Sequence, residues 1–424
     1  MDYTFSPVTD FTELEDAVAR LYGPAAAPRQ LERYRGLLKG LEETFGPCGR
    51  AAVFSAPGRT EIGGNHTDHQ HGRVLAGSID LDAIAAVAPN TEGIIRLQSE
   101  GYPLIEVALD DLEVHPGEVN TSAAIIRGVA AWFARQGCAL EGFNAYVMSN
   151  VLGGSGLSSS AAFEVLVGNI INSLFFGDRC PPIQIAQIGQ YAENVYFGKP
   201  SGLLDQMGCS VGGMVAIDFK DNANPVVEKI DFDFATSGHA LCIIDSGADH
   251  ADLTPEYAAV PGELKEICAH FGRSVLREVP EADFFAALPT LRRKVGDRAV
   301  LRAVHIYGDN ARVAGQVEAL RRGDFDAFLM HVTKSGLSSW RYLQNVVPAG
   351  YTHHQEVAVA LAMAERLLDG RGACRVHGGG FAGTIQAFVP LDMLDGFKTE
   401  MDRVLGGGAC HVLTIRPVGG VRLA

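Results

Sequence analysis

Apolar residues follow two patterns along the first half of the chain, a helical spacing and short continuous runs typical of strands. Residues 1 to 45 predict two helices, joined by a hinge rich in proline and alanine near 23–28. The apolar residues of the second helix follow helical spacing, namely Leu31, Tyr34, Leu37, Leu38 and Leu41. Short apolar runs then predict strands at 51–55, 81–88, 93–98 and 104–109. A helix over about 121–136 and a strand at 144–148 follow.

A polar stretch at 220–225 interrupts this pattern and predicts a domain boundary between about 220 and 238. Beyond it lies a long helical block at about 283–345. A strand, a glycine-rich turn and a second strand follow at 373–389, and then a helix and a final strand near 411–415. Because strands and helices do not alternate regularly, the pattern predicts an α+β protein rather than a doubly wound parallel sheet.

Composition narrows the class of protein. The chain has 424 residues, of which 47% are apolar and 20% charged, so we expect a globular protein of two domains, each of roughly 200 residues. The formal charge of -15 makes nucleic acid and membrane surfaces poor partners. The eight cysteines are scattered without a C-x-x-C pair, which favours buried thiols in the cytoplasm. We find no signal peptide and no apolar run of about 18 residues.

A glycine- and serine-rich turn at 153–160 follows a predicted strand and opens an apolar helix. Glycines let the backbone approach an anion, and the free amides of a helix start bind phosphate. The turn ends in Ser158-Ser159-Ser160, not in the Gly-Lys-Ser/Thr of a Walker loop, and it lacks the later glycine of the dinucleotide fingerprint. A serine-capped helix without a ligand is the alternative interpretation.

Two carboxylates are candidates for phosphoryl-transfer chemistry. Asp205 follows a turn containing glycine and proline, and it could orient an alcohol or accept its proton. Glu193 lies near the end of a predicted helix and could give Mg²⁺ an oxygen ligand. The alternatives are an aspartate in a solvated loop and a glutamate on the surface.

The segment 59–71 gathers histidines and acids, including His66, Asp68, His69 and His71. Neither their order nor their spacing fits a zinc site, which makes a metal centre the weaker interpretation. Carboxylate, amide and imidazole groups also hydrogen-bond hydroxyls with direction, so the segment favours a sugar-binding loop.

Three stretches together resemble the GHMP small-molecule kinases, and among them the galactokinases. The first runs from Pro57-Gly58-Arg59 to His66-Thr67-Asp68, and the second is the turn at 153–162. The third is Gly378-Gly379-Gly380-Phe381, which follows Ala373-Cys374-Arg375. Residues 302–305 and 256–257 also resemble galactokinase segments, so the likeness spans about 45 to 420 in the same order.

The resemblance implies a two-domain GHMP kinase fold. Residues 1–45 would be a helical extension. Residues 46–230 would form an N-terminal domain like ribosomal protein S5, which binds ATP and sugar, and residues 231–424 a ferredoxin-like C-terminal domain. The implied activity is transfer of the ATP γ-phosphoryl to the C1 hydroxyl of galactose, by a cytoplasmic monomer that uses Mg²⁺. The alternatives are a kinase for galacturonate, N-acetylgalactosamine or arabinose, and a non-catalytic sugar or ATP sensor.

The resemblance also implies a role for individual residues. Asp205 would be the base, and Arg59 would stabilise developing charge beside it. The sugar would be bound by Asn65, His66, Asp68, Gly202 and Tyr257. ATP would be bound by Gly153, Gly154, Ser155, Gly156, Leu157, Ser158, Ser159 and Gly379. Ser160 (or Ser159) and Glu193 would hold Mg²⁺.

The first motif departs from the galactokinase pattern, because Glu61 and Asn65 stand where that family has asparagine and glutamate. His69, Arg73, Val376 and His377 also replace the usual residues. Since the family's glutamate is understood to bind the sugar C6 hydroxyl, one hypothesis is that this site tolerates another C6 group, including a carboxylate. A second hypothesis is that Glu61 and Asn65 touch, so that the exchange keeps one hydrogen-bonded pair.

Overall fold

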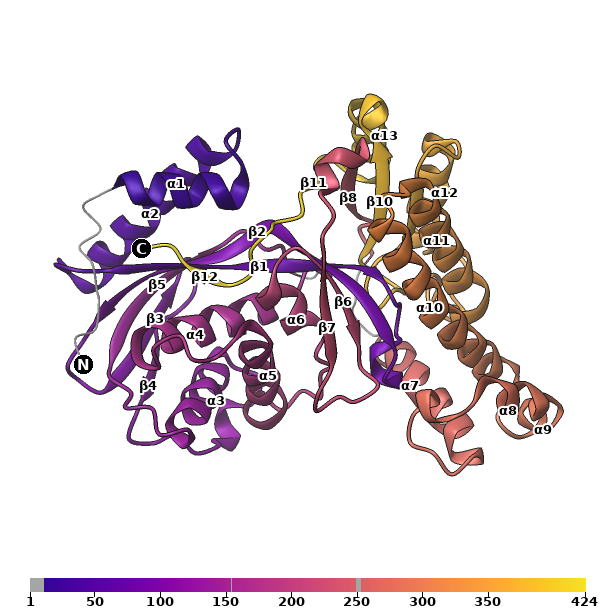
Figure 1. The fold of residues 1–424 in the computed structure, drawn as a ribbon, viewed down its shortest axis with the longest axis horizontal. Helices are drawn as coiled ribbons and strands as arrows, with labels where there is room; N and C mark the ends of the chain where they lie inside the picture. The colour runs from indigo at the N-terminus through magenta and orange to yellow at the C-terminus, as the bar shows by residue number, and fades with distance from the viewer. Residues whose placement is uncertain (1–10, 154, 249–252) are drawn as a thin grey trace.

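Two β-sheets with helices on their faces make up the protein (Figure 1). The computed structural model describes residues 11–153, 155–248 and 253–424. An eight-stranded sheet dominates the first half, and a four-stranded sheet lies in the second. The two sheets and their helices confirm the predicted α+β class.

The large sheet has the strand order β12-β1-β2-β5-β3-β4, and β6 pairs with β2 and with β7. Its strands are β1 (Ala52–Gly63), β2 (Arg73–Pro89), β3 (Ile94–Ser99), β4 (Ile105–Ala108), β5 (Phe143–Ser149), β6 (Met214–Asp218), β7 (Val226–Ile230) and β12 (Val421–Arg422). Strands β3 and β5 are parallel, and the other pairs are antiparallel. The β1–β2 register shifts on either side of Arg59 to Glu61.

Helices cover both faces of this sheet (Figure 1). One face carries α3 (Ser122–Arg135), α4 (Ser159–Phe175), α5 (Pro182–Ala192) and α6 (Leu204–Val211), and the other carries α1 (Phe11–Tyr22) and α2 (Ala27–Phe45). Alternate residues of β1 point to opposite faces of the sheet. Phe54 packs in the core under α3 and α4, and Val53 packs in the core under α1 and α2. A strand buried on both faces reads as a continuous apolar run, as Ala52-Val53-Phe54 at the start of β1 do.

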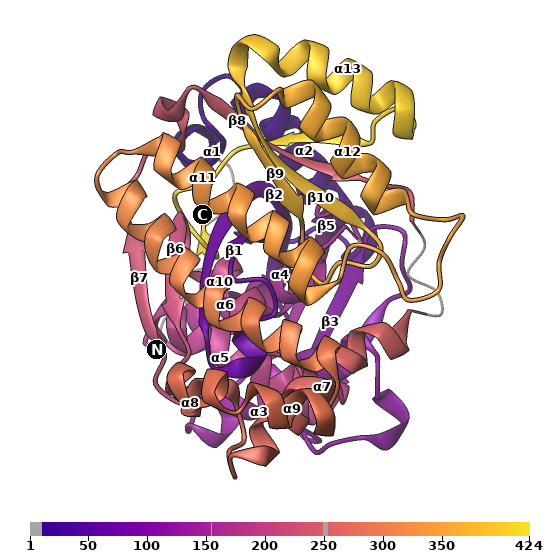
Figure 2. The same ribbon diagram turned by 90° about the vertical axis from the view of Figure 1, so that its right-hand side faces the viewer.

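The small sheet has the order β11-β8-β10-β9 and is antiparallel throughout. Its strands are β8 (His239–Asp245), β9 (Ala373–Val376), β10 (Thr384–Pro390) and β11 (Cys410–Leu413). Figure 2 shows α12 (Glu356–Leu368) and α13 (Leu394–Leu405) beside it, and α10 (Asp297–Arg321) and α11 (Phe325–Ser338) running across the molecule. Cys242 of β8 packs in the core with α12 and α13, whereas its neighbour Ile243 belongs to the large core.

The remaining elements are short or peripheral. They are α7 (Thr254–His270), α8 (Glu281–Ala286), α9 (Leu288–Lys294), η1 (Asp68–Gln70), η2 (Pro116–Glu118), η3 (Glu193–Phe197), η4 (Phe234–Ser237), η5 (Leu276–Glu278), η6 (Ser339–Leu343) and η7 (Leu391–Met393). In the described residues no helix is both long and apolar enough to cross a membrane. All eight cysteines are free, and seven are buried.

The structure revises the predicted boundaries of several elements. Strand β1 continues through the motif at 57–63, and β2 begins at Arg73 rather than at 81. The polar stretch 220–225 is the turn between β6 and β7, which both belong to the large sheet. The proposed division of the chain after 45 and 230 stays a prediction, and β12 returns the end of the chain to the large sheet beside β1.

Candidate active site

Arg59 and Asp205 form an ion pair at the centre of the candidate site. Arg59 lies on β1, where a register shift beside Pro57 bends the strand, and its side chain is 7% exposed. Its Nε and Nη2 both donate to Asp205 Oδ1, at 2.9 and 2.6 Å. Asp205 lies in the first turn of α6, not in a loop as the sequence had suggested. The structure thus joins two predicted residues that are 146 positions apart.

The second oxygen of Asp205 accepts a hydrogen bond from Ser158 Oγ at 2.7 Å. Burial by itself would raise the pKa of Asp205, but the Arg59 charge and the hydrogen bonds from Ser158 and Arg59 lower it below the usual value. Asp205 is therefore an ionised carboxylate, and its side chain is 37% exposed. An ionised carboxylate held on both oxygens can orient a hydroxyl or accept its proton.

Ser158 stands at the start of α4 in the left-handed conformation, with φ 59°. Its hydroxyl bonds Asp205 and makes no capping hydrogen bond to α4 among the described residues, so the interpretation as a mere serine cap is wrong. The turn before it is tied to β1, because Arg59 Nη1 donates to Gly156 O and the Arg59 amide donates to Leu157 O at 3.1 Å. Gly154 lies outside the described residues.

A cavity of about 390 Å³ opens beside this turn. Its lining joins β2, β5, α3, α4 and η3, and includes Gly153, Ser159, Ser160, Glu164 and Glu193. The cavity therefore brings the amide-rich start of α4 together with two carboxylates. A helix N-terminus with free amides favours a phosphate group, and carboxylate and hydroxyl oxygens suit a hard cation.

Glu193 and Glu164 share one amide donor, because Gln206 Nε2 donates to Glu193 Oε2 at 2.9 Å and to Glu164 Oε2 at 2.8 Å. Lys199 Nζ lies 2.8 Å from the other Glu193 oxygen. Glu164 Oε1 is buried and has no hydrogen-bond partner among the described residues. Mg²⁺ prefers oxygen ligands. The unpartnered oxygen of Glu164, close to the Glu193 carboxylate that pairs with Lys199, therefore fits this ion. The described residues hold no group of three or more His, Cys, Asp or Glu arranged around a metal position.

Two of the predicted sugar-binding residues, Asp68 and Gly202, lie against each other. A Cβ atom on Gly202 would stand 2.7 Å from Asp68 Oδ2, so this carboxylate contacts the turn that leads into α6. His66 has φ 59° and its Nε2 lies 2.9 Å from Gly379 O. Burial lowers the pKa of His66 to about 4, so the ring is neutral and donates through Nε2 to that carbonyl.

The glycine turn after β9 contacts Tyr257 as well as His66. Tyr257 of α7 donates its hydroxyl to Gly380 O at 2.7 Å and packs edge-on against Phe381. A Cβ on Gly379 would stand 2.7 Å from the Tyr257 ring, so only glycine allows this approach. His66 and Tyr257 therefore both hydrogen-bond carbonyls of this turn, and their proposed contact with a sugar stays a prediction.

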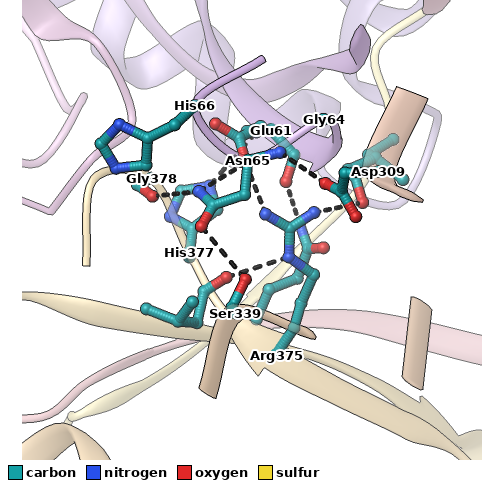
Figure 3. A network of polar contacts seen from close by, with 12 residues as sticks. Glu61, Gly64, Asn65, His66, Asp309, Ser339, Arg375, His377 and Gly378 are labelled. Atoms are coloured by element: carbon teal, nitrogen blue, oxygen red, sulfur yellow. Dashed lines mark hydrogen bonds and ion pairs between the residues drawn. The ribbon is translucent and has the colours of Figure 1, made fainter. Parts of the chain in front are cut away.

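The side chain of Asn65, which the sequence predicted to bind the sugar, hydrogen-bonds protein groups instead (Figure 3). Its Nδ2 donates to Glu61 Oε1 at 3.2 Å and to Gly378 O at 2.6 Å. Its Oδ1 accepts from Asn345 Nδ2 at 2.8 Å and from Ser339 Oγ at 3.2 Å. Because these four bonds fill the amide, Asn65 acts as a buried clasp between the halves of the chain. The contact between Glu61 and Asn65 is present, as the second hypothesis predicts.

Sequence reasoning missed the ionic partners of this clasp. Arg375 of β9 donates from Nη2 to Glu61 Oε1 at 2.5 Å, and its Nη1 donates to Ile62 O at 3.0 Å. Asp309 of α10 accepts from the backbone N–H of Asn65 at 2.8 Å. These partners are separated by more than 240 positions, so no local pattern could pair them, although Arg375 was already part of the third motif.

Comparisons with known proteins agree with this geometry. A family model for the galactokinase galactose-binding signature matches residues 41–89, and one for the GHMP kinases N terminal domain matches 124–213. A galactokinase from Streptomyces coelicolor is 31% identical, covering 94% of this chain and 99% of that protein. One from Glaesserella parasuis is 28% identical, covering 84% and 90%.

Solved structures share the fold. Lactococcus lactis galactokinase complexed with galactose matches with a TM-score of 0.77 at 24% identity, covering 92% of this chain and 99% of that one. A mevalonate kinase matches with a TM-score of 0.61 at 14% identity, covering 86% and 99%. The Streptomyces relative aligns over nearly the whole of both chains, so this chain belongs to the galactokinase family of the GHMP kinases.

Proposed function

We propose that this protein transfers the γ-phosphoryl group of ATP to the C1 hydroxyl of galactose. The observation that carries the proposal is the position of Asp205. Its carboxylate is held by Arg59 on one oxygen and by Ser158 of the glycine-serine turn on the other, while Asp68 contacts Gly202 in the turn that leads into α6. A sugar in contact with Asp68 and Asp205 would present its hydroxyl to a phosphate bound at the start of α4.

Asp205 orients the hydroxyl and accepts its proton. The lowered pKa of Asp205 keeps it ionised at neutral pH, so it acts as an acceptor throughout the physiological range. Arg59 stabilises the negative charge that develops during transfer, and its bond to Gly156 O fixes the phosphate turn relative to the base. Since phosphoryl transfer depends mainly on positioning and charge, these contacts supply what the reaction needs.

Mg²⁺ would be held by Glu193 and by Ser160 or Ser159, and Glu164 lines the same cavity. When bound, the ion would neutralise phosphate charge during transfer. Glu193 is paired with Lys199, and Gln206 donates to both Glu193 and Glu164.

Galactose is proposed as the sugar because the relatives from Streptomyces and Glaesserella are galactokinases and the Lactococcus structure contains galactose. In this chain His66, Asp68, Gly202 and Tyr257 are the residues proposed to surround the sugar. Asn65 is left out of that set, because its amide is filled by protein groups. The monomeric state and the cytoplasmic location stay predictions.

The experiment is Mg-ATP-dependent ADP release with galactose, N-acetylgalactosamine, arabinose, galacturonate and glucose, with Asp205→Ala as control. Turnover on galactose that is abolished in Asp205→Ala supports the proposal. Preference for galacturonate or arabinose over galactose would support the hypothesis of an altered C6 group and overturn galactose as substrate. Sugar and nucleotide binding without turnover would identify a sensor.

A further inference from the structure

His377 links the two sheets at the edge of the site. It follows β9 and is 2% exposed, beside Glu61 in Figure 3. Its Nε2 lies 3.2 Å from the Glu61 amide nitrogen and 3.1 Å from Thr60 Oγ1. A backbone amide can only donate, so Nε2 of His377 is an acceptor and carries no proton.

The neutral ring therefore has its proton on Nδ1, and this fixes the direction of a chain of hydrogen bonds. His377 Nδ1 lies 3.0 Å from Thr384 Oγ1, and the Thr384 hydroxyl donates to Ser155 O at 2.9 Å. The Thr384 oxygen is thus free to accept from Nδ1–H. The relay consists of the Glu61 amide, His377, Thr384 and the Ser155 carbonyl, in that order.

Both ends of the relay adjoin the proposed catalytic groups. Glu61 is two residues after Arg59 on β1, and Ser155 precedes Gly156, whose carbonyl accepts from Arg59 Nη1. A Cβ on Gly156 would stand 3.2 Å from His377 Nδ1, so the ring also packs directly on the phosphate turn. His377 therefore contacts both the strand of Arg59 and the turn at 155–156.

We propose that His377 is a positioning residue which, through Thr384, holds the Ser155–Gly156 turn in the geometry that binds the nucleotide phosphates. The inference rests on the proposed function for the identity of the ligand. Loss of the hydrogen bond from His377 to Thr384, or of the one from Thr384 to Ser155, frees the turn and weakens nucleotide binding. Loss of the Glu61 side leaves the turn anchored.

The charge of the ring is consistent with this role. Burial, followed by the nearby Arg59 and Arg375 cations, lowers the pKa of His377 well below its usual value, and Asp205 opposes them only partly. The ring is neutral at physiological pH and keeps one acceptor and one donor, as the relay requires.

The test separates the two sides of the ring. His377→Asn places an amide near the Nδ1 position and keeps the donor to Thr384, whereas His377→Gln places it near Nε2 and keeps the Glu61 side. Thr384→Val removes the hydroxyl with little change of volume. Val389→Ala, which is also buried on β10, is the control for general loss of packing. The measurement is calorimetric binding of a non-hydrolysable ATP analogue with Mg²⁺, together with KM for ATP and kcat.

We expect His377→Gln and Thr384→Val each to weaken nucleotide binding about 5- to 10-fold, as for loss of one buried hydrogen bond. The double variant should be no weaker than either single, because both break the same link. His377→Asn and Val389→Ala should stay within about 2-fold of the unmodified protein. The proposal is overturned if His377→Gln and Thr384→Val bind normally, or if His377→Asn or Val389→Ala weakens binding equally. Because binding is measured without turnover, failure of the kinase proposal would appear separately, as absence of sugar phosphorylation.

Discussion

The Asn65 amide donates a hydrogen bond to Glu61 Oε1 at 3.2 Å, and Arg375 donates to the same oxygen at 2.5 Å. One buried carboxylate therefore serves an amide and a guanidinium at once. Glu61 is 5% exposed and Arg375 is fully buried, so the ion pair has little access to water. Removing one partner from such a pair leaves an uncompensated buried charge.

We predict that Glu61→Asn lowers the free energy of unfolding by about 3–5 kcal/mol, because Arg375 loses its carboxylate. Asn65→Glu should also destabilise, since it places a second carboxylate against Glu61. The double exchange restores one amide and one carboxylate, so we expect a favourable coupling of about 1–3 kcal/mol. Urea denaturation of the four proteins measures it. A double variant no more stable than its worse single would mean that the two positions act independently.

We predict that Arg59 sets the acid limit of activity through the pKa of Asp205. Asp205 must be ionised to act as the base, and Arg59 is the main charge that lowers its pKa against burial. In Arg59→Met burial would dominate, so the pKa of Asp205 should rise and the acid limb of kcat/KM should move to higher pH. We also expect kcat to fall about 100- to 1000-fold, because a charge-stabilising donor is lost.

The pH profile of kcat/KM with galactose measures the shift of this limb, and Arg59→Lys is the control that keeps the charge. Its acid limb should stay closer to that of the unmodified protein than the limb of Arg59→Met. An unmoved acid limb in Arg59→Met would show that another group governs the profile.

Local sequence signals predicted the glycine-serine turn at 153–160, whereas contacts between distant residues could not be predicted from the sequence. Glycines followed by serines and an apolar helix are adjacent along the chain, so the pattern at 153–160 predicted the turn directly. The pairing of Arg59 with Asp205 came only from the resemblance, since 146 positions separate them. The clasp at Asn65 was unpredictable, because Ser339 and Asn345 reach it from 274 and 280 positions away. The predicted strand at 51–55 was too short, because glycine and polar residues at 58–61 interrupt the apolar run. These residues are nevertheless buried and belong to β1.

Glu193 and Lys199 should have opposite effects on the Mg²⁺ requirement. Lys199 Nζ lies 2.8 Å from Glu193 Oε1, so a cation that binds this oxygen must displace the ammonium. Lys199→Met should lower the Mg²⁺ concentration for half-maximal turnover by up to about 5-fold, the worth of a partly exposed ion pair. Glu193→Gln should raise it about 10- to 100-fold.

Titration of turnover with Mg²⁺ at fixed ATP, supported by calorimetry, distinguishes these variants. Lys39→Met on the exposed face of α2, whose ion-pair partner is Glu43, is the matched control and should leave the Mg²⁺ requirement unchanged. A higher Mg²⁺ requirement in Lys199→Met would show instead that the ammonium helps to bind the phosphates.

Asp82 ties the N-terminal helices to the large sheet. Its fully buried carboxylate lies 2.5 Å from Arg33 Nη1 of α2 and 3.0 Å from Arg416 Nη1, and it also accepts from Tyr22 and Ser55. Burial would raise the pKa of Asp82, but the two arginines and the hydroxyls lower it below the usual value. We predict that Asp82→Asn lowers the free energy of unfolding by about 3–5 kcal/mol at pH 7, since both guanidinium groups lose their counterion.

The pH dependence of unfolding supplies the more specific check on Asp82. A carboxylate whose pKa is lowered by folding stabilises the fold at pH values above its pKa in the unfolded chain, which is about 4. That contribution is lost as the pH falls through the pKa of the carboxylate in the folded protein. The difference in the free energy of unfolding between the unmodified protein and Asp82→Asn should therefore be constant from pH 7 to about 5 and become smaller below pH 4. Tyr22→Phe removes one hydrogen bond but no charge, so it should cost only about 1 kcal/mol. A gap that does not change with pH would show that Asp82→Asn acts through packing rather than through the buried charge.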